Sequence, residues 1–482
     1  MREPSLRDLT GTIRHLDASR ARQLVEAFQR PVVYGRTGIA YDADDPVVTG
    51  CDENLRLATA ASPDGSVDVL GHFQTHLHLH GLLRVPLSVA RELARHSGHL
   101  HLNHVPAITD AVAAELATHD GGGLSLDNLL RLSGPAAAFL GWHGGELSFK
   151  RVRQLSVAAA RGLAQHANDL FLNGLVSLSP LVAASLAKHR GDLTLDGLEF
   201  LAGSAARHLA RHGGKLHLHG LTALSDEVAE AFGQRTGYLC LSKVQQLSRL
   251  QVERLAGHVG ALLLSKISVD DAVAECLGRH RGSLVVRLPA DVPLPWLKSL
   301  VMHQGPLEIS GLARLDERQA QVLARQSGPR GLRGLSCLFI DTVDRISPAV
   351  AAILARHEAG GLSLNSITDI TEDVARELVK HPILSLDRLP RVSDQVAAIL
   401  ATHAGVTLSL RGLTEVSPRA IAILKAVPSI ELSRCLAVEA GPTRLAGSDQ
   451  ARRPMGDDLV RLITKIACRG NEPHDSGSEP PQ

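Results

Sequence analysis

Leucine alternates with variable residues in short segments that recur along most of the chain. Two of these segments read LHLHGL from Leu77 and LTLDGL from Leu193. Alternation of apolar and variable residues is the period of a β-strand with one buried face. Each segment therefore predicts a short strand that buries its leucines and presents the residues between them on the opposite, variable face.

The spacing of these segments is nearly constant. Successive segments start 22 to 24 residues apart, and one interval, from Leu307 to Leu338, is 31 residues long. That interval contains SGPRGLRG, in which Gly and Pro predict an extra surface loop. A fixed period of this size indicates a repeat architecture. The segments begin at Leu77, Leu100, Leu124, Leu147, Leu170, Leu193, Leu216, Leu239, Leu262, Leu284, Leu307, Leu338, Leu362, Leu384, Leu408 and Ile430.

A short helix is predicted after each strand. In VSLSPLVAASLAKHRG, Ser179 is expected to cap the first free amides, Pro180 suits the first helical turn, and Gly191 suits a left-handed exit. Helices this short are not stable alone, so they must pack on neighbouring helices. Similar starts recur at Ser225, Ser347, Thr371, Ser393 and Ser417.

Strand, turn, short helix and return, repeated in one direction, predict a parallel sheet with right-handed crossovers. From Leu77 to Cys435 the units resemble leucine-rich repeats of the bacterial kind, whose period is roughly 23 residues. The fold class is therefore predicted to be α/β, a right-handed leucine-rich-repeat-like solenoid with the sheet on one face and short helices on the other. The family's usual Asn, three residues after the LxL core, is replaced here by apolar residues such as Leu82 and Leu175. This difference leaves the curvature of the solenoid unpredicted.

The two ends of the chain depart from the repeat. We expect residues 1–70 to cap the solenoid of about 15 units at 71–435, because an end coil has one face without a neighbour. A separate small domain and a degenerate first repeat are the alternatives. Within this region LDASRARQLVEAFQR predicts an amphipathic helix with Asp17 or Ser19 as its cap.

Residues 436–482 form the C-terminal region. The stretch MGDDLVRLITKIA, residues 455–467, predicts a closing helix. The polar residues after it, which include Pro and Gly, predict a disordered tail.

One set of histidines occupies a single repeat position at the end of each predicted helix. Arg235 and Gln326 stand at the same position in two other repeats. A residue that recurs in every coil meets a structural need of every coil. We expect each imidazole to donate to the last helical carbonyls, and its protonated form to be favoured by the negative helix end. The set comprises His96, His119, His143, His166, His189, His212, His258, His280, His303, His357, His381 and His403.

A second set of histidines lies on the variable face of the predicted strands. His76, His78 and His80 point to this face, and the next strand places more polar residues beside them, namely His99, His101 and Asn103. Two to four such imidazoles could share a Zn or Cu ion. The same positions hold Ser, Asp, Lys and other residues elsewhere, which favours an ordinary polar face. The motif LHLHGL recurs with His217 and His219, there without an expected flanking cluster.

An enzymatic alternative uses the first of these histidine groups. The stretch VDVLGHFQTHLHLH resembles the strand-borne HxH of metal-dependent amidohydrolases, which implies a hydrolase metal site at His76, His78 and His80. Those enzymes need further ligands at the ends of later barrel strands, whereas this chain continues as short repeats.

Composition narrows the classes of function. Lys and Arg number 51 and Asp and Glu 50, so the net charge of +1 provides no field for nucleic acid or an anionic membrane. Aromatic residues make up only 3%, which disfavours a small-molecule pocket. The six cysteines lack CxxC spacing and are expected to be reduced thiols, and no apolar run reaches membrane-spanning length. Together these features predict a cytoplasmic protein. The sequence also lacks the common nucleotide-binding and hydrolase motifs.

Function is expected on the variable strand face, because the core leucines serve the fold. Fifteen or sixteen strands about 4.8 Å apart would span on the order of 70 Å, which suits another macromolecule. We therefore predict a non-enzymatic scaffold that binds a protein partner. The predicted binding residues are His78, His80, His101, Asn103, Asp127, Lys150, Phe171, Asn173, Asp196, His217, His219, Arg287, Glu308, Phe339, Asp341, Asp387 and Arg411.

Two other hypotheses stay open beside the scaffold. One is a purely structural array without a partner, and the other is the metal-binding or hydrolase site at His76, His78 and His80. Under the preferred hypothesis the chain is a monomer that binds no cofactor, no metal, no nucleic acid and no membrane.

Overall fold

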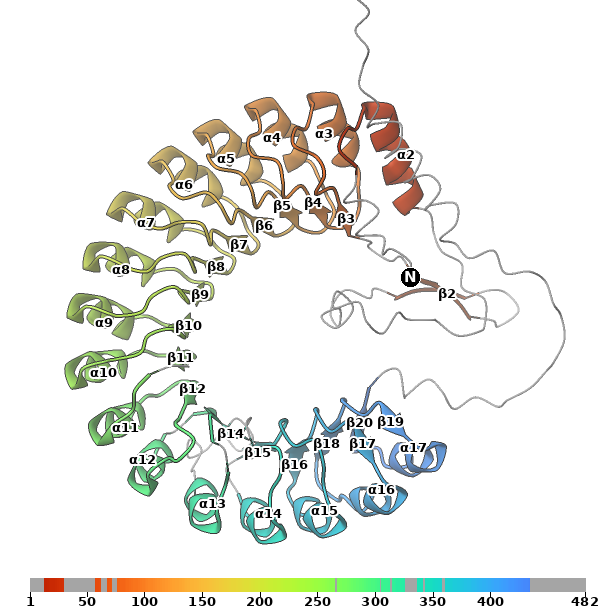
Figure 1. Ribbon diagram of the computed structural model, residues 1–482, viewed down its shortest axis with the longest axis vertical. Helices are drawn as coiled ribbons and strands as arrows, with labels where there is room; N and C mark the ends of the chain where they lie inside the picture. Colours follow the sequence, from red (N-terminus) through yellow and green to blue (C-terminus); the bar gives the residue numbers. More distant parts are fainter. Residues whose placement is uncertain are drawn as a thin grey trace, which may run out of the picture. The chain divides into compact units, whose positions relative to one another are not determined.

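The computed structural model describes residues 13–29, 57–61, 67–71, 76–264, 267–303, 305–312, 314–325, 336–340, 343–357 and 360–433. The chain divides into two units, one formed by residues 1–195 with 450–482 and the other by residues 196–449. In both units a short strand alternates with a short helix along the described chain (Figure 1).

The strands of the first unit run parallel and pair in sequence order. Leu77 lies opposite Leu100, and Leu100 lies opposite Leu124, so the leucine columns are in register. The strands are β3 (Leu77–His78), β4 (Leu100–His101), β5 (Leu124–Ser125), β6 (Leu147–Ser148), β7 (Leu170–Phe171) and β8 (Leu193–Thr194). The helices between them are α3 (Leu87–Leu93), α4 (Asp110–Ala117), α5 (Gly134–Leu140), α6 (Val157–Leu163) and α7 (Pro180–Leu186).

The second unit repeats this arrangement, and Leu239 again pairs with Leu216 and Leu262. Its parallel sheet contains β9 (Leu216–His217), β10 (Leu239–Cys240), β11 (Leu262–Leu264), β12 (Leu284–Arg287), β13 (Leu307–Ser310), β14 (Ser336–Ile340), β15 (Gly360–Ser363), β16 (Ile383–Ser385), β18 (Thr407–Leu410) and β20 (Ile430–Leu432). A further parallel pair joins β17 (Arg391–Val392) and β19 (Glu415–Val416).

The helices of the second unit are as short as those of the first. They are α8 (Gly203–Leu209), α9 (Asp226–Gly233), α10 (Arg249–Leu255), α11 (Asp271–Leu277), α12 (Leu294–Leu300), α13 (Glu317–Leu323), α14 (Pro348–Leu354), α15 (Glu372–Leu378), α16 (Asp394–Leu400) and α17 (Pro418–Lys425). In each unit the helices form one layer and the strands the other (Figure 1). The predicted α/β solenoid is therefore confirmed.

The core lies between the two layers and consists of leucine columns. Leu77, Leu79 and Leu82 are fully buried, and the buried positions of the helices hold small or branched residues such as Val89 and Ala90. Burying one leucine side chain stabilises a fold by about 1.5–3 kcal/mol, so each coil depends on its neighbours for stability.

The predicted helix start at Ser179 is confirmed, because its side chain accepts a hydrogen bond from the Val182 amide at 3.3 Å and Pro180 opens the helix. The predicted left-handed exit at Gly191 is wrong. That residue has no positive φ, and the helix ends earlier, at Leu186. A Cβ at Gly191 would lie 2.2 Å from the carbonyl oxygen of Asn168, so glycine is required there for close packing of adjacent coils.

The N-terminal region contains α2 (Ala18–Gln29), which confirms the predicted amphipathic helix. Asp17 caps it by accepting a hydrogen bond from the Arg20 amide at 2.8 Å. Helix α2 packs against α3, and Arg22 pairs with Glu92 at 2.8 Å. This packing agrees with a cap at the first coil, although the role of residues 1–70 as a whole stays a prediction.

Two antiparallel strands, β1 (Leu57–Ala61) and β2 (Val67–Gly71), also lie in the N-terminal region. The predicted closing helix at 455–467, the tail after it, and the SGPRGLRG insert lie outside the described residues.

Candidate functional site

The variable face of the strands carries most of the predicted binding residues as half-exposed or exposed side chains. Lys150, Arg287 and Arg411 are exposed. The prediction that His78 contacts a partner is not supported, because its side chain is only 8% exposed and offers little surface. Asp341 lies outside the described residues.

Several residues of this face bind the next coil rather than solvent. Asp196 Oδ1 accepts a hydrogen bond from the His219 amide at 3.0 Å. In the same way Asn365 Oδ1 accepts from the Asp387 amide at 2.8 Å, and Asp387 Oδ1 accepts from the Arg411 amide at 3.0 Å. A side-chain oxygen directly after the core leucines therefore satisfies the backbone amide one coil later. Asp196 and Asp387 were predicted to bind a partner, Asn365 was not, and this structural ladder was not predicted.

The charges of the variable face are paired between neighbouring coils. Lys150 lies 2.8 Å from Asp127, and Arg411 lies 2.8 Å from Glu431. Such exposed ion pairs contribute little stability. Their alternating signs give the face a mixed electrostatic pattern, which agrees with the near-zero net charge.

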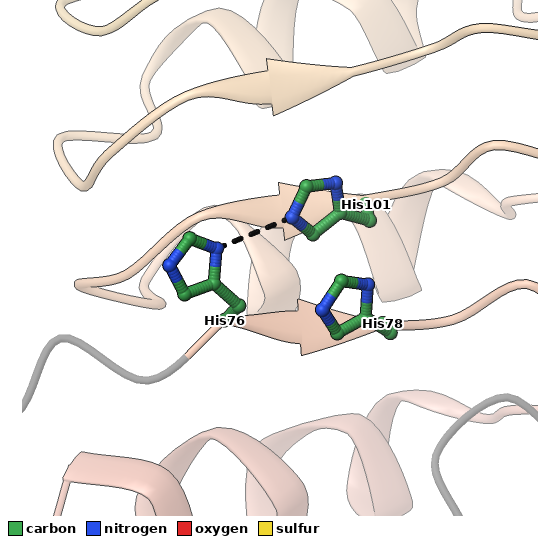
Figure 2. A group of neighbouring side chains, drawn as sticks. All are labelled: His76, His78 and His101. Carbon is green, nitrogen blue, oxygen red and sulfur yellow. Dashed lines mark hydrogen bonds between the residues drawn. The ribbon is translucent and has the colours of Figure 1, made fainter. Parts of the chain in front are cut away.

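The histidines of β3 and β4 form a compact cluster (Figure 2). His76 Nδ1 lies 3.3 Å from His101 Nε2, and the rings of His78 and His101 stack with centroids 4.2 Å apart. One ligand nitrogen from each of His76, His78 and His101 lies within 4.8 Å of the others. The structure thus groups His76 and His78 with His101, one of the neighbouring-strand imidazoles considered for a shared ion, rather than with His80.

Burial keeps these imidazoles neutral. Burial, with smaller effects from the neighbouring histidines, lowers the pKa of His101 to about 2. The pKa values of His76 and His99 are also lowered, mainly by burial. Neutral imidazole is the form that binds transition metals, so a metal ion would meet no competition from protons at neutral pH.

A second cluster lies on β9 and β10, where the sequence predicted no flanking cluster. His217 pairs in register with Cys240, and one ligand atom from each of His217, His219 and Cys240 lies within 4.8 Å of the others. Cys240 Sγ lies 3.1 Å from His219 Nε2, and His219 Nδ1 lies 2.7 Å from Asp196 Oδ1. The expectation was wrong because the partners come from the coils one repeat before and after.

The helix-end histidines form a buried column in each unit, with exposed fractions between 0% and 4%. His119 Nδ1 lies 3.0 Å from His143 Nε2, and His258 Nδ1 lies 3.2 Å from His280 Nε2. The imidazoles therefore contact one another across coils, in addition to backbone groups after the helices. Their role is structural, as predicted, but the expected partners differ: the rings contact carbonyls after the helix, as His303 does at Gly305, or in the neighbouring coil, rather than the last helical carbonyls.

The expected protonation of this column is wrong. Burial lowers the pKa of His119 and His280 to about 3, and that of His258 to about 4. Desolvation of the charged form outweighs the helix dipole, because the rings lie inside the protein rather than at its surface.

Arg235 replaces histidine in the column of the second unit. Its side chain is 0% exposed, and its guanidinium donates to the carbonyls of His212, Gly214 and Tyr238. Burial lowers its pKa to about 10. Arginine can stand here because these carbonyls, with that of Leu209, accept hydrogen bonds from both terminal nitrogens of the guanidinium. Gln326 lies outside the described residues.

An open groove of about 590 Å³ lies beside the strand ends in the second unit. It contains Arg287, a predicted binding residue, together with Leu288 and Trp296. The Trp296 indole donates to Asp271 at 2.6 Å, which fixes the ring at the groove wall.

The structure also bears on two further predictions, the hydrolase alternative and the absence of membrane-spanning segments. In each unit the described strands follow a linear order, whereas the amidohydrolase resemblance requires a closed barrel. The hydrolase part of that alternative is therefore not supported, although His76, His78 and His101 do lie close together. No helix in the described ranges has the length and apolar character needed to cross a membrane.

Neither a model of a protein family nor a curated protein matches this chain. Among solved structures, the chain is similar to a leucine-rich-repeat protein of Leptospira interrogans, with a TM-score of 0.38, 18% identity, and coverage of 74% of this chain and 94% of that one. It is also similar to an internalin of Listeria monocytogenes, with a TM-score of 0.28, 11% identity, and coverage of 73% and 84%. It is similar, too, to a chain in the structure of the yeast Rad7 and Elc1 complex, with a TM-score of 0.37, 15% identity, and coverage of 72% of this chain and 88% of that one. The leucine-rich-repeat-like architecture of the chain rests on its own repeated strand–helix units and parallel strand order, in agreement with the resemblance of its sequence.

Proposed function

We propose that this chain is a non-enzymatic scaffold that binds a protein partner on the variable face of its strands. The observation that carries the proposal is the separation of the two faces. The strand leucines are fully buried, while the residues directly after them, such as Asp127, Lys150 and Arg411, are polar, of both charges, and partly or fully accessible over coil after coil. A surface of this kind suits a macromolecule better than a small substrate.

The dimensions of each unit support this proposal. With neighbouring strands about 4.8 Å apart, six strands span about 24 Å and ten strands span about 43 Å. Either length exceeds what a small molecule needs and suits a standard protein interface. The mixed signs of Lys150 and Asp127, or Arg411 and Glu431, favour a partner with its own alternating charges over a polyanion.

The best candidates for direct contact are side chains that project from the face without accepting a hydrogen bond from a backbone amide of the next coil. In the first unit these include Lys150 and the half-exposed aromatic ring of Phe171. Aromatic side chains are enriched at interfaces because they bury a large area with little loss of conformational freedom. Phe339 occupies the corresponding register on β14 in the second unit.

A pull-down with matched variants tests this proposal. The face variant combines Lys150→Glu with Phe171→Ala. The control is Lys188→Glu, which changes an exposed residue just after the end of α7. We expect proteins captured by the unmodified chain to be lost with the face variant and kept with the control. Equal capture by both variants would contradict the proposed face, and no specific capture would favour the structural array.

Metal binding at His76, His78 and His101 is a second candidate function, favoured by the convergence of three imidazoles. Zinc takes such nitrogen ligands at about 2.0–2.1 Å. Calorimetric titration with Zn²⁺ tests it. We expect His76→Ala with His101→Ala to lose one binding event and His104→Ala, an exposed neighbour on the same coil, to keep it. Unchanged binding in the double variant would exclude this site.

A further inference from the structure

We propose that His217, His219 and Cys240 form a zinc site in the second unit, with Asp196 as the outer carboxylate that orients His219. The donor set is two imidazoles and one thiol, brought together by two adjacent strands and the coil before them. Asp196, His217 and His219 also lie on the predicted partner-binding face, but this proposal stands on their contacts with one another and with Cys240.

The ligand atoms are already close to a coordination sphere. Tetrahedral zinc with Zn–N near 2.0–2.1 Å and Zn–S near 2.3 Å separates its ligand atoms by about 3.3–3.6 Å. Cys240 Sγ and His219 Nε2 are 3.1 Å apart, and no ligand atom of the three is more than 4.8 Å from another. Closing onto an ion therefore requires side-chain shifts of about 1.5 Å at most.

Asp196 prepares His219 for metal binding. Its Oδ1 accepts hydrogen bonds from both the His219 amide, at 3.0 Å, and the ring Nδ1, at 2.7 Å. The ring proton is therefore held on Nδ1, and the lone pair of Nε2 is directed toward the Cys240 sulfur. A carboxylate that holds the far nitrogen of a ligand histidine is the usual outer shell of zinc sites.

The thiol supplies the third ligand by giving up its proton. In the metal-free chain the Cys240 S–H donates to His219 Nε2. When Zn²⁺ binds, the S–H bond breaks, both electrons stay on sulfur, an S–Zn bond forms, and the proton leaves to solvent. Three protein ligands leave a fourth position for water or for a group of a bound partner.

The order Asp196, His219, Cys240 also matches the arrangement of a nucleophilic cysteine, but two observations disfavour that chemistry. Cys240 is 0% exposed, so a substrate cannot approach its sulfur. Burial raises the pKa of the thiol, whereas a catalytic cysteine needs a lowered pKa. A small ion can enter beside the partly exposed imidazoles, and its positive charge displaces the thiol proton on coordination.

Cobalt substitution tests the site, because a thiolate ligand gives Co²⁺ a near-ultraviolet charge-transfer band that imidazoles alone do not. We expect the purified full chain titrated with Co²⁺ to develop this band, and Zn²⁺ in excess to remove it. Cys240→Ser should abolish the band. Two controls should keep it: Cys276→Ser, which alters the buried thiol of α11, and His76→Ala with His101→Ala, which alters the other histidine cluster.

Asp196→Asn provides a graded test, because the amide oxygen can still accept both hydrogen bonds but lacks the charge. We expect it to keep the band and to weaken Co²⁺ affinity by about 10- to 100-fold, as outer-shell changes do. If Cys240→Ser fails to fold by circular dichroism, His217→Ala is read in the same assay and should weaken the Co²⁺ affinity reported by the band. Absence of the band in the unmodified chain, or its persistence in Cys240→Ser, would overturn the proposal.

Discussion

The helix-end histidine column and the strand-face histidines use the same side chain for different purposes. In the column the imidazole recurs once per coil and is almost fully buried, as at His143 and His280. On the strand face of the described coils, imidazoles gather with other ligand atoms at two places, around His101 and around His219. A residue repeated with the period of the fold serves the fold, whereas a residue that interrupts the pattern marks a candidate site.

The largest expected effect comes from acidifying the column. Its folded pKa values, about 3 for His119 and about 4 for His303, lie below the unfolded value near 6.5. The unfolded chain therefore binds more protons between these values, so stability is fully present above pH 6.5 and falls as the pH decreases. Each such histidine contributes about 1.4 kcal/mol per pH unit in this window.

Urea unfolding followed by circular dichroism at pH values from 7.5 down to 4 measures this effect. We expect the midpoint to fall steeply below pH 6.5 and the chain to unfold before pH 4. A midpoint that stays constant down to pH 4 would show that the column does not carry neutral, buried imidazoles.

Arg235 sharpens the comparison within the column. Arg235→Ala removes the donors for four backbone carbonyls and leaves a cavity, so we expect a loss of about 3–5 kcal/mol of unfolding free energy. Arg235→His restores the residue of the other coils and should lose clearly less. Denaturant titration measures the unfolding free energy of both variants. Equal losses of unfolding free energy would mean that an imidazole at this position stabilises the column no more than alanine does.

A single histidine of the column compared with one of the strand face gives a smaller effect. His280→Ala leaves a cavity and removes the contacts to His258 and His303, so we expect a loss of about 2–4 kcal/mol. The exposed His104→Ala should change stability by less than about 0.5 kcal/mol. Similar losses in the two variants, measured by urea unfolding, would remove the distinction between the two sets.

The helix caps give the smallest effect. Ser179→Ala removes the acceptor for the Val182 amide and should cost about 1 kcal/mol. The exposed Ser97→Ala, outside any helix, serves as the control and should be neutral. An equally neutral Ser179→Ala would mean that packing alone determines where α7 begins.

Most of the fold could be predicted because each coil repeats the same physical problem. The leucine register, from Leu77 to Leu100 and onward, follows directly from the period of the sequence. Gly191 could not be assigned correctly, because its role depends on the approach of Asn168 from the neighbouring coil rather than on its own helix. The sequence pattern predicts local conformation, but it does not predict how closely neighbouring coils approach each other.

The candidate sites could be predicted only in part. Clustered histidines around His76 are visible in one stretch of sequence, whereas Cys240 and Asp196 lie far from His219 along the chain. Adding and subtracting one repeat would have brought them together: Asp196 and His219 are 23 residues apart, and so are His217 and Cys240. The protonation of the column could not be predicted, because it depends on burial that a helix-end position alone does not reveal.

The central claim is that the position of a histidine within the repeat decides whether it is structural or available to a ligand. Site-resolved modification by diethyl pyrocarbonate at pH 7, read by peptide mass spectrometry, tests it most directly. We predict that column residues such as His143 and His280 stay unmodified while His104 and His219 react, and that added Zn²⁺ protects His219 but not His104. Modification of the column at the rate of His104 would contradict the account.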